Sequence, residues 1–280
     1  MSRFLSPSTI CSSSVSTRNT LAVVLAALIV SGCAFSGCSR HSQFLERKVT
    51  LGDHTYRYRV WLPHHYTKLH HWPVIVYLHG SAERGSDNER QVSTGLAPAL
   101  ERYGERYKAV VIFPQCESGR EWYGESELMA QAELVAAIQE FHGDSRRVLL
   151  TGISMGGAGV WYMARHNREW AALVPIAGEV SRQSDDPFPS DPPPDIARIV
   201  GSRDPYATLA AQIGRTPVWV FHGANDDVVP VRESRSMVSA LKQGGGNVRY
   251  TEYPNGVHNV WDDAYADPAM VHWMLQQKLR

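Results

Sequence analysis

The sequence predicts an α/β protein with a mostly parallel central sheet covered by helices on both faces. Short apolar runs, which are typical of buried parallel strands, alternate with helix-like stretches over more than 200 residues. The composition agrees, because 43% of the 280 residues are apolar and 28 basic side chains balance 28 acidic ones. Such a chain is too apolar to be disordered and has no basic excess for nucleic acid, so we expect a globular protein without a nucleic-acid partner.

The expected strands are of two kinds. Residues 56–62 (YRYRVWL) and 248–253 alternate polar and apolar side chains, as half-exposed strands do. Continuous apolar runs, as in buried strands, occupy residues 74–78, 109–113, 148–150, 173–176 and 218–221. Helical spacing is found between them, in residues 128–141, 155–166, 232–242 and 268–279. The sequence shows no internal repeat and no second domain.

One stretch does not fit this alternation. Residues 181–206 include five prolines between Pro187 and Pro194, and such a run can form neither a helix interior nor a central strand. It predicts an exposed loop in polyproline conformation, or else a cap over a substrate-binding site.

The N-terminus has the features of an export signal. Residues 1–20 carry two arginines and no acid, and residues 21–30 (LAVVLAALIV) are apolar without a break. Ten helical residues rise about 15 Å, about half of a bilayer core, so this run predicts a signal peptide rather than a membrane span. The sequence VSGC ending at Cys33 resembles a bacterial lipobox, which implies cleavage before Cys33 and a lipid on its sulfur. An uncleaved anchor or an ordinary signal peptide is the alternative.

The lipobox resemblance implies a lipoprotein signal peptide over 1–32 and a lipidated tether over 33–47, which leaves 48–280 as the folded domain. Ala34 stands where an aspartate would signal retention at the inner membrane. We therefore expect a lipid-anchored protein of the bacterial cell envelope, at the outer membrane where there are two membranes. Cys38 and Cys116 could pair in an oxidising compartment.

The first chemical signal is the sequence GISMG, residues 152–156, directly after the strand at 148–150. In a tight turn from strand to helix, glycines two residues before and after a serine leave room for the turn and expose the hydroxyl. The motif alone is weak, since a chain with 22 glycines matches it easily by chance. The strand before it and the helix after it make Ser154 the predicted nucleophile.

Two further signals follow later strands. Asp226 and Asp227 come after the strand at 218–221, and His258 comes after the strand ending near Tyr253. A carboxylate orients a catalytic histidine, which then acts as base and as acid. The order serine, acid, histidine is that of α/β-hydrolases, and the carboxyl ends of parallel strands meet at one edge of a sheet. Either aspartate can supply the acid on this evidence.

The loop that follows the strand at 74–78 is the fourth signal. Its sequence, residues 79–85, is HGSAERG. Attack on an acyl carbon creates an oxyanion that needs two N–H donors already aimed at it. The residue after the nucleophile supplies one donor, and this loop is expected to supply the other.

These motifs together resemble those of the α/β-hydrolase superfamily, in the carboxylesterase and phospholipase-like branch. Polyester depolymerases, feruloyl esterases and predicted peptidases belong to the same branch. The resemblance covers residues 48–280 and is most specific in residues 79–85, 114–122 and 222–230. It implies the α/β-hydrolase fold.

The resemblance also implies the roles of individual residues. It assigns the acid to Asp226, four residues after His222, and leaves Asp227 as the alternative. It assigns the two oxyanion donors to the backbone amides of Ser81 and Met155.

Further implied roles concern the surroundings of the nucleophile. Trp122 resembles an aromatic residue of the substrate pocket, although a merely packed tryptophan is the alternative, and His79 is expected to contact substrate. Glu83 and Arg84 are expected to brace the oxyanion loop. A pocket limited by Trp122 and the proline-rich segment would favour short acyl groups.

Two pairs of adjacent histidines are candidate metal ligands. Adjacent side chains diverge and no carboxylate lies between them, so a solvated loop is the better interpretation of His64, His65, His70 and His71. The sequence has no H-E-x-x-H motif and no phosphate-binding glycine loop, so we expect neither metal nor cofactor.

The sequence as a whole predicts a serine hydrolase that cleaves small-molecule or polymer carboxylic esters through an acyl-enzyme. Three alternatives remain at this point. The first is a serine peptidase or amidase for small substrates, and the second is an envelope acyltransferase in which another acceptor replaces water. The third is a surface-binding protein that has the fold without activity.

Overall fold

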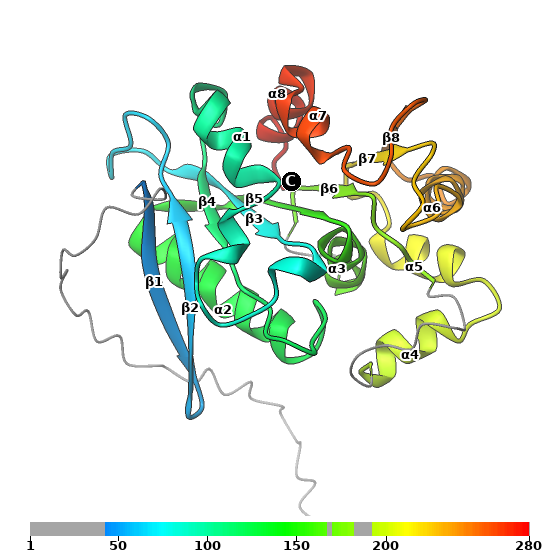
Figure 1. Cartoon of the computed structure of the whole chain (residues 1–280), viewed down its shortest axis with the longest axis horizontal. Helices are drawn as coiled ribbons and strands as arrows, with labels where there is room; N and C mark the ends of the chain where they lie inside the picture. Colours follow the sequence, from blue (N-terminus) through cyan, green and yellow to red (C-terminus); the bar gives the residue numbers. More distant parts are fainter. Residues whose placement is uncertain (1–42, 167–169, 182–191, 280) are drawn as a thin grey trace, which may run out of the picture. The chain divides into compact units, whose positions relative to one another are not determined.

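The computed structural model describes residues 43–166, 170–181 and 192–279, which all belong to one unit, Ser39–Arg280. Its strands form a sheet in the order β1-β2-β4-β3-β5-β6-β7-β8 (Figure 1). Strand β2 is antiparallel to both of its neighbours, and all pairs from β4 to β8 are parallel. The strands are β1 Phe44–Leu51, β2 His54–Trp61, β3 Trp72–Leu78, β4 Val110–Phe113, β5 Gly143–Ile153, β6 Ala172–Ile176, β7 Val218–Gly223 and β8 Val248–Tyr253.

The connections between the strands contain the helices. The α-helices are α1 Leu96–Tyr103, α2 Glu125–Glu140, α3 Met155–Met163, α4 Pro194–Val200, α5 Pro205–Ile213, α6 Arg232–Gln243, α7 Trp261–Ala266 and α8 Pro268–Leu275. Short 3₁₀ helices are found at η1 Ser81–Glu83, η2 Arg90–Val92, η3 Gly104–Arg106 and η4 Ala164–His166. Every predicted strand and helix has its counterpart, whereas α1, α4, α5 and α7 were not predicted.

Helices cover both faces of the sheet, as predicted (Figure 1). Along β3, Val74, Val76 and Leu78 belong to one hydrophobic cluster, while Ile75 and Tyr77 belong to the other. Helices α2, α3, α5 and α6 contribute to the first cluster, and α1, α7 and α8 contribute to the second. Because successive side chains of a strand alternate between two buried faces, the strand reads as a continuous apolar run.

The sheet begins earlier than predicted. Strand β1 starts at Phe44, so the predicted tether over 33–47 ends too late by four residues. Phe44 is 3% exposed and packs edge-on against Phe113, with 5.5 Å between ring centroids. The alternation of β1 is hidden in the sequence because Arg47 occupies one of its less exposed positions, where it binds Glu140 of α2 at 2.8 Å.

The C-terminal helix is shorter than the predicted span of 268–279. Helix α8 ends at Leu275, and the chain then turns back toward β5. The amide of Leu279 donates a hydrogen bond to the carbonyl of Arg146 at 2.8 Å. The Leu279 amide therefore finds its acceptor on β5 instead of within a longer helix.

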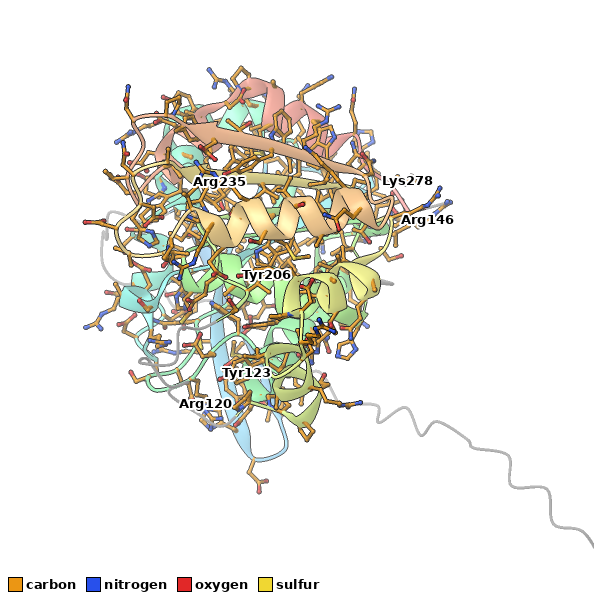
Figure 2. All side chains as sticks on the ribbon, turned by 90° about the vertical axis from the view of Figure 1, so that its right-hand side faces the viewer. Arg120, Tyr123, Arg146, Tyr206, Arg235 and Lys278 are labelled. Carbon is orange, nitrogen blue, oxygen red and sulfur yellow. The ribbon has the colours of Figure 1, made fainter. Side chains whose placement is uncertain are left out.

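The proline-rich segment is partly helical, which corrects the prediction of an exposed loop. Pro194 opens α4 and Pro205 opens α5, in the first turn where the missing N–H is not needed. Ile196 of α4 is fully buried in a small cluster with Tyr123 (Figure 2) and Tyr162. The remainder of this segment, 182–191, lies outside the described residues.

Candidate active site

Ser154 lies on the turn between β5 and α3, at φ +53° and ψ −119°. Residues other than glycine rarely adopt these backbone angles, and such strain is typical of functional sites. The Ser154 amide donates to the carbonyl of Ile176 on β6 at 2.9 Å. A Cβ on Gly152 would lie 2.4 Å from the Gly156 oxygen, and one on Gly156 would lie 2.0 Å from the Leu78 oxygen. The turn therefore needs glycine on both sides of the serine.

The Gly156→Ala substitution is expected to lower the free energy of unfolding by about 3 kcal/mol or more, because the backbone of β3 or α3 has to move. Gly244→Ala is the matched control, since Gly244 has φ −76° and the nearest atom to its added Cβ is 3.4 Å away. Urea unfolding of both variants measures the difference. Equal stability of the two would contradict the close approach at Gly156.

Ser154, His258 and Asp226 form a continuous hydrogen-bonded chain. His258 Nε2 lies 2.9 Å from Ser154 Oγ, and His258 Nδ1 lies 2.7 Å from Asp226 Oδ2. The His258 side chain is 16% exposed and that of Asp226 is fully buried. Asp227 is exposed and has no contact with His258 among the described interactions. The structure thus brings Asp226, not Asp227, to the histidine, in a geometry that allows proton transfer from the serine.

The loops after β7 and β8 approach each other closely, which places Asp226 beside His258. A Cβ on Gly223 would lie 2.3 Å from the carbonyl oxygen of Val257. The amide of Asn225 donates to the carbonyl of Gly256 at 2.9 Å. The backbones therefore fix the relative positions of the two loops.

The Asp226 carboxylate accepts three hydrogen bonds and lies close to a second imidazole. The amides of Val228 and Val229 donate to Oδ1 at 2.9 and 2.8 Å, and the imidazoles of His258 and His222 reach Oδ2 at 2.7 and 3.1 Å. Burial by itself raises the pKa of Asp226, but these hydrogen bonds outweigh burial and hold the pKa well below its usual range. Asp226 is therefore an anion throughout the neutral and mildly acidic range.

The loop after β3 lies beside the nucleophile. A Cβ on Gly80 would be 3.7 Å from the Cβ of Ser154. Within the described part of the chain, no acceptor is found for the amide N–H of Ser81 or of Met155. Met155 is the next residue after Ser154, and Ser81 follows Gly80, which lies beside Ser154 in space. Both predicted oxyanion donors are thus near the nucleophile and available to a ligand.

The prediction that His79 and Trp122 contact substrate is wrong, because both side chains are buried in the core. His79 is 0% exposed and its Nε2 accepts a hydrogen bond from the Cys116 amide at 2.9 Å. Trp122 is 1% exposed and its Nε1 donates to the carbonyl of His79 at 3.0 Å. Both residues therefore support the oxyanion loop, and the packed alternative holds for Trp122.

A pH dependence of stability follows from the burial of His79, which lowers its pKa to about 4. The unfolded chain takes up a proton at this side chain near pH 6.5, so stability is complete above that pH and falls as the pH drops toward 4. Over this interval of about 2.5 pH units, the loss amounts to about 3 kcal/mol. Urea unfolding at pH 7 and 4.5 is expected to show a smaller loss for His79→Gln than for the wild type. The exposed His272→Gln is the control, and identical losses in all three proteins would refute the assignment.

Arg84 braces the oxyanion loop, as predicted. Its guanidinium donates to the Glu121 carboxylate and to the Arg120 carbonyl, each at 2.6 Å. The Gln115 amide donates to the carbonyl of Glu83 at 3.2 Å. The loop is therefore anchored to the segment after β4. Burial raises the pKa of the Glu83 carboxyl, which lies against Gly80.

The histidine pairs have ordinary surface contacts. His64 Nδ1 lies 2.7 Å from a carboxylate oxygen of Glu105, and the ring of His71 stacks on His142. Within residues 43–166, 170–181 and 192–279, no group of three or more side chains could hold a metal ion.

Cys116 is a buried free thiol. Burial raises its pKa to about 11, so it is a thiol and not a nucleophile at neutral pH. Its predicted partner Cys38 lies outside the described residues.

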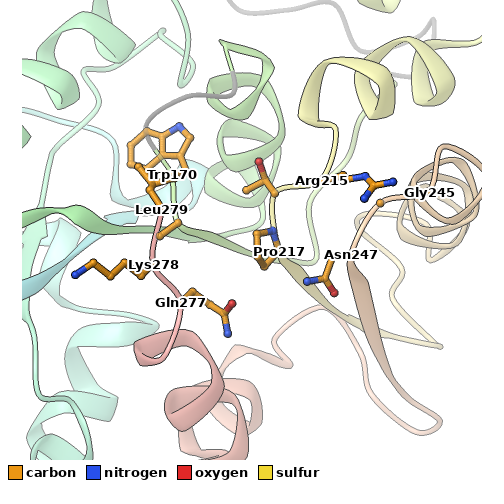
Figure 3. A pocket seen from close by; sticks show the side chains of 11 residues that line it. Trp170, Arg215, Pro217, Gly245, Asn247, Gln277, Lys278 and Leu279 are labelled. Atoms are coloured by element: carbon orange, nitrogen blue, oxygen red, sulfur yellow. The ribbon is translucent and has the colours of Figure 1, made fainter.

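A cleft of about 520 Å³ lies away from Ser154, Asp226 and His258 (Figure 3). It is lined by Trp170, Pro217 and Asn247, which precede β6, β7 and β8, and by residues 277–279. Ser154, Asp226 and His258 follow the carboxyl ends of strands, so the cleft is at the opposite edge of the sheet and is not the acyl site.

Two contacts of the site were not predicted. His222 reaches Asp226, and Trp261 packs edge-on against His258 with 5.3 Å between ring centroids. The spacing of four residues between His222 and Asp226 was the available signal for the first. Nothing in the sequence distinguished Trp261 from other core aromatics.

Comparison with known proteins gives a family match. The model of the prolyl oligopeptidase family matches residues 117–277. Among curated proteins, an uncharacterized secreted protein of Arthroderma benhamiae is 26% identical over 204 residues, which is 66% of this chain. This chain spans only 21% of that relative's length.

Several solved structures share the fold. A thermostable esterase is 28% identical with a TM-score of 0.67, over 84% of this chain and 63% of that chain. An S-formylglutathione hydrolase from Staphylococcus aureus is 16% identical with a TM-score of 0.64, over 83% of this chain and 98% of that chain. An acylaminoacyl peptidase from Pyrococcus horikoshii is 16% identical with a TM-score of 0.62, over 86% of this chain and 43% of that chain. These structures show the same fold, and their names include an esterase, a hydrolase and a peptidase.

Proposed function

Because the chain belongs to the prolyl oligopeptidase family, we propose that it is a serine hydrolase that cleaves carboxylic esters. The observation that carries this proposal is the chain from Ser154 through His258 to Asp226, with contacts of 2.9 and 2.7 Å. The similarity to a thermostable esterase at 28% identity favours esters as the substrates.

The proposed reaction proceeds through an acyl-enzyme. His258 Nε2 takes the proton of Ser154 as the hydroxyl attacks the ester carbonyl, and Asp226 stabilises the resulting imidazolium. The amides of Ser81 and Met155 bind the oxyanion. His258 then gives its proton to the leaving alcohol, and water repeats the sequence to release the acid.

Amide hydrolysis is the second candidate, because the family is named for a peptidase. A p-nitrophenyl ester and a p-nitroanilide of the same acyl group, given to the full-length protein in detergent, separate the two. We expect the ester to be cleaved with a kcat/KM at least about 10³-fold above that of the anilide. An anilide within about tenfold of the ester would make peptide-like amides the better assignment.

The length of the acyl group is a separate question. The expected preference for short chains loses its basis in Trp122, whose ring is buried. A series of p-nitrophenyl esters from acetate to palmitate, with a feruloyl ester added, measures it. Fastest turnover of palmitate would reject the preference for short chains.

We further propose that the protein is a lipoprotein of the bacterial envelope, anchored through Cys33. In the part of the chain that the structure describes, no helix has both the length and the apolar character of a membrane span. The lipobox and the apolar run 21–30 lie outside these residues. Metabolic labelling with a palmitate analogue is expected to mark the wild type and not Cys33→Ala. Equal labelling of both proteins would reject the anchor.

A further inference from the structure

A second imidazole contacts the acid of the site. His222, at the end of β7, places its Nε2 3.1 Å from Asp226 Oδ2, the same oxygen that accepts the hydrogen bond from His258 Nδ1 at 2.7 Å. Asp226 Oδ1 is occupied by the amides of Val228 and Val229. Three hydrogen bonds and the close approach of His222 therefore surround the carboxylate, and together they fix its plane.

The orientation of His222 is itself determined by its contacts. Its side chain is 0% exposed, its Nε2 lies 2.9 Å from the Val229 carbonyl, and its Nδ1 lies 2.7 Å from Ser234 Oγ on α6. A carbonyl oxygen can only accept, so Nε2 carries the hydrogen and donates it to Val229, while Asp226 Oδ2 lies 3.1 Å from the same nitrogen. In the neutral ring, Nδ1 then accepts the hydrogen of the Ser234 hydroxyl.

The neighbouring charges do not compete for His222. Its register partner on β8 is Glu252, but the carboxylate of Glu252 accepts hydrogen bonds from Arg235 (Figure 2) at 2.6 and 2.8 Å and from Tyr250 at 2.6 Å. Asp226 is therefore the carboxylate that His222 contacts. The contacts form one chain, Ser234–His222–Asp226–His258–Ser154.

We propose that His222 is a positioning residue for catalysis, which holds Asp226 Oδ2 in the direction of His258 while Ser234 fixes the tautomer of His222. This inference rests on the proposed roles of Ser154, His258 and Asp226. Partners that orient the ligands of a metal site typically contribute about 10- to 100-fold to affinity or activity, and we expect an effect of the same order here. The effect falls on the chemical step, because His222 is buried behind Asp226 and does not touch substrate.

The test compares three variants of the full-length protein. His222→Phe removes both the N–H and the acceptor, and is expected to lower kcat about 10- to 100-fold with KM unchanged. In His222→Gln the side-chain amide nitrogen can take the place of Nε2, so this variant is expected to recover most of the loss. Ser234→Ala leaves the ring in place without its tautomer lock and is expected to lower kcat about threefold. Val220→Ala, on the same strand, is the control for a core defect that leaves the chain of contacts intact.

Two readouts separate this inference from the proposed function. The rate at which a fluorophosphonate probe labels Ser154 does not depend on the natural substrate, and it is expected to fall in parallel with kcat. Failure of the wild type to label at all would refute the proposed function. Labelling of folded His222→Phe at the wild-type rate would refute only the role of His222, as would equal losses in His222→Phe and His222→Gln with a raised KM. If His222→Phe does not fold, a wild-type kcat in Ser234→Ala overturns the inference and a reduced kcat with unchanged KM supports it.

Discussion

The Ser154→Ala variant is expected to lose at least about 10⁵-fold in kcat/KM for its best ester, because it lacks the only atom that forms the acyl-enzyme. The residual activity would come from substrate binding and from the oxyanion donors. Stability should be unchanged, since alanine occupies the same φ of +53° and the lost hydroxyl contacts His258 alone among the described residues.

The measurement is the initial rate with a p-nitrophenyl ester, together with labelling by a fluorophosphonate probe. Ser93→Ala is the matched control, because Ser93 is an exposed serine whose hydroxyl donates to the carbonyl of Arg90 at 2.7 Å. Wild-type rates in Ser154→Ala would remove the proposed mechanism altogether. Loss of activity in Ser93→Ala as well would point to a damaged preparation rather than to a missing nucleophile.

The second large effect is expected for Asp226→Asn, which should lower kcat by about 10⁴-fold. The single oxygen of asparagine can replace either Oδ1, which faces the amides of Val228 and Val229, or Oδ2, which faces the two imidazoles, but not both. Its NH₂ must then face either two amides or two imidazole N–H groups, all of which are donors. His258 therefore loses the contact that selects its tautomer and stabilises its cation. An unpaired buried donor also lowers the free energy of unfolding by about 1–3 kcal/mol, so the rates are measured well below the melting temperature.

Asp227→Asn is the control that decides between the two adjacent aspartates. Asp227 is exposed, and we expect its variant to keep the wild-type kcat within about twofold. A loss of about 10⁴-fold in Asp227→Asn, with normal activity in Asp226→Asn, would reverse the assignment. Equal and small losses in both variants would mean that His258 works without a carboxylate partner.

The catalytic residues could be located from the sequence because they interrupt apolar strands. Ser154, Asp226 and His258 each follow a predicted strand, and residues at the carboxyl ends of parallel strands gather at one edge of the sheet. The choice between Asp226 and Asp227 was open from spacing alone. The structure decides it, because the loops after β7 and β8 meet at Gly223 and Val257 and direct Asp226 toward the imidazole.

The errors have a common cause, which is that burial was not visible in the sequence. His79 and Trp122 stand in a functional motif, yet both pack into the core behind the oxyanion loop. The predicted tether overlaps the first four residues of β1, whose alternation is hidden because Arg47 stands at a less exposed position, where Glu140 of α2 pairs with it. Each of these contacts joins residues more than 35 positions apart.

By itself, the sequence determined the fold class, the positions of most strands along the chain and the identity of the nucleophile and its histidine. These depend on local patterns, such as apolar runs, and on glycines that a tight turn requires. Spacing left the choice between Asp226 and Asp227 open, although the family resemblance implied Asp226, and the contact with His258 decides it. Only the tertiary structure revealed that His222 and Ser234 lie behind Asp226 and that His79 is a support. Such roles depend on which side chains the sheet brings within about 3 Å of each other, and hydrogen-bonding distance is a property of the packed chain rather than of spacing along it.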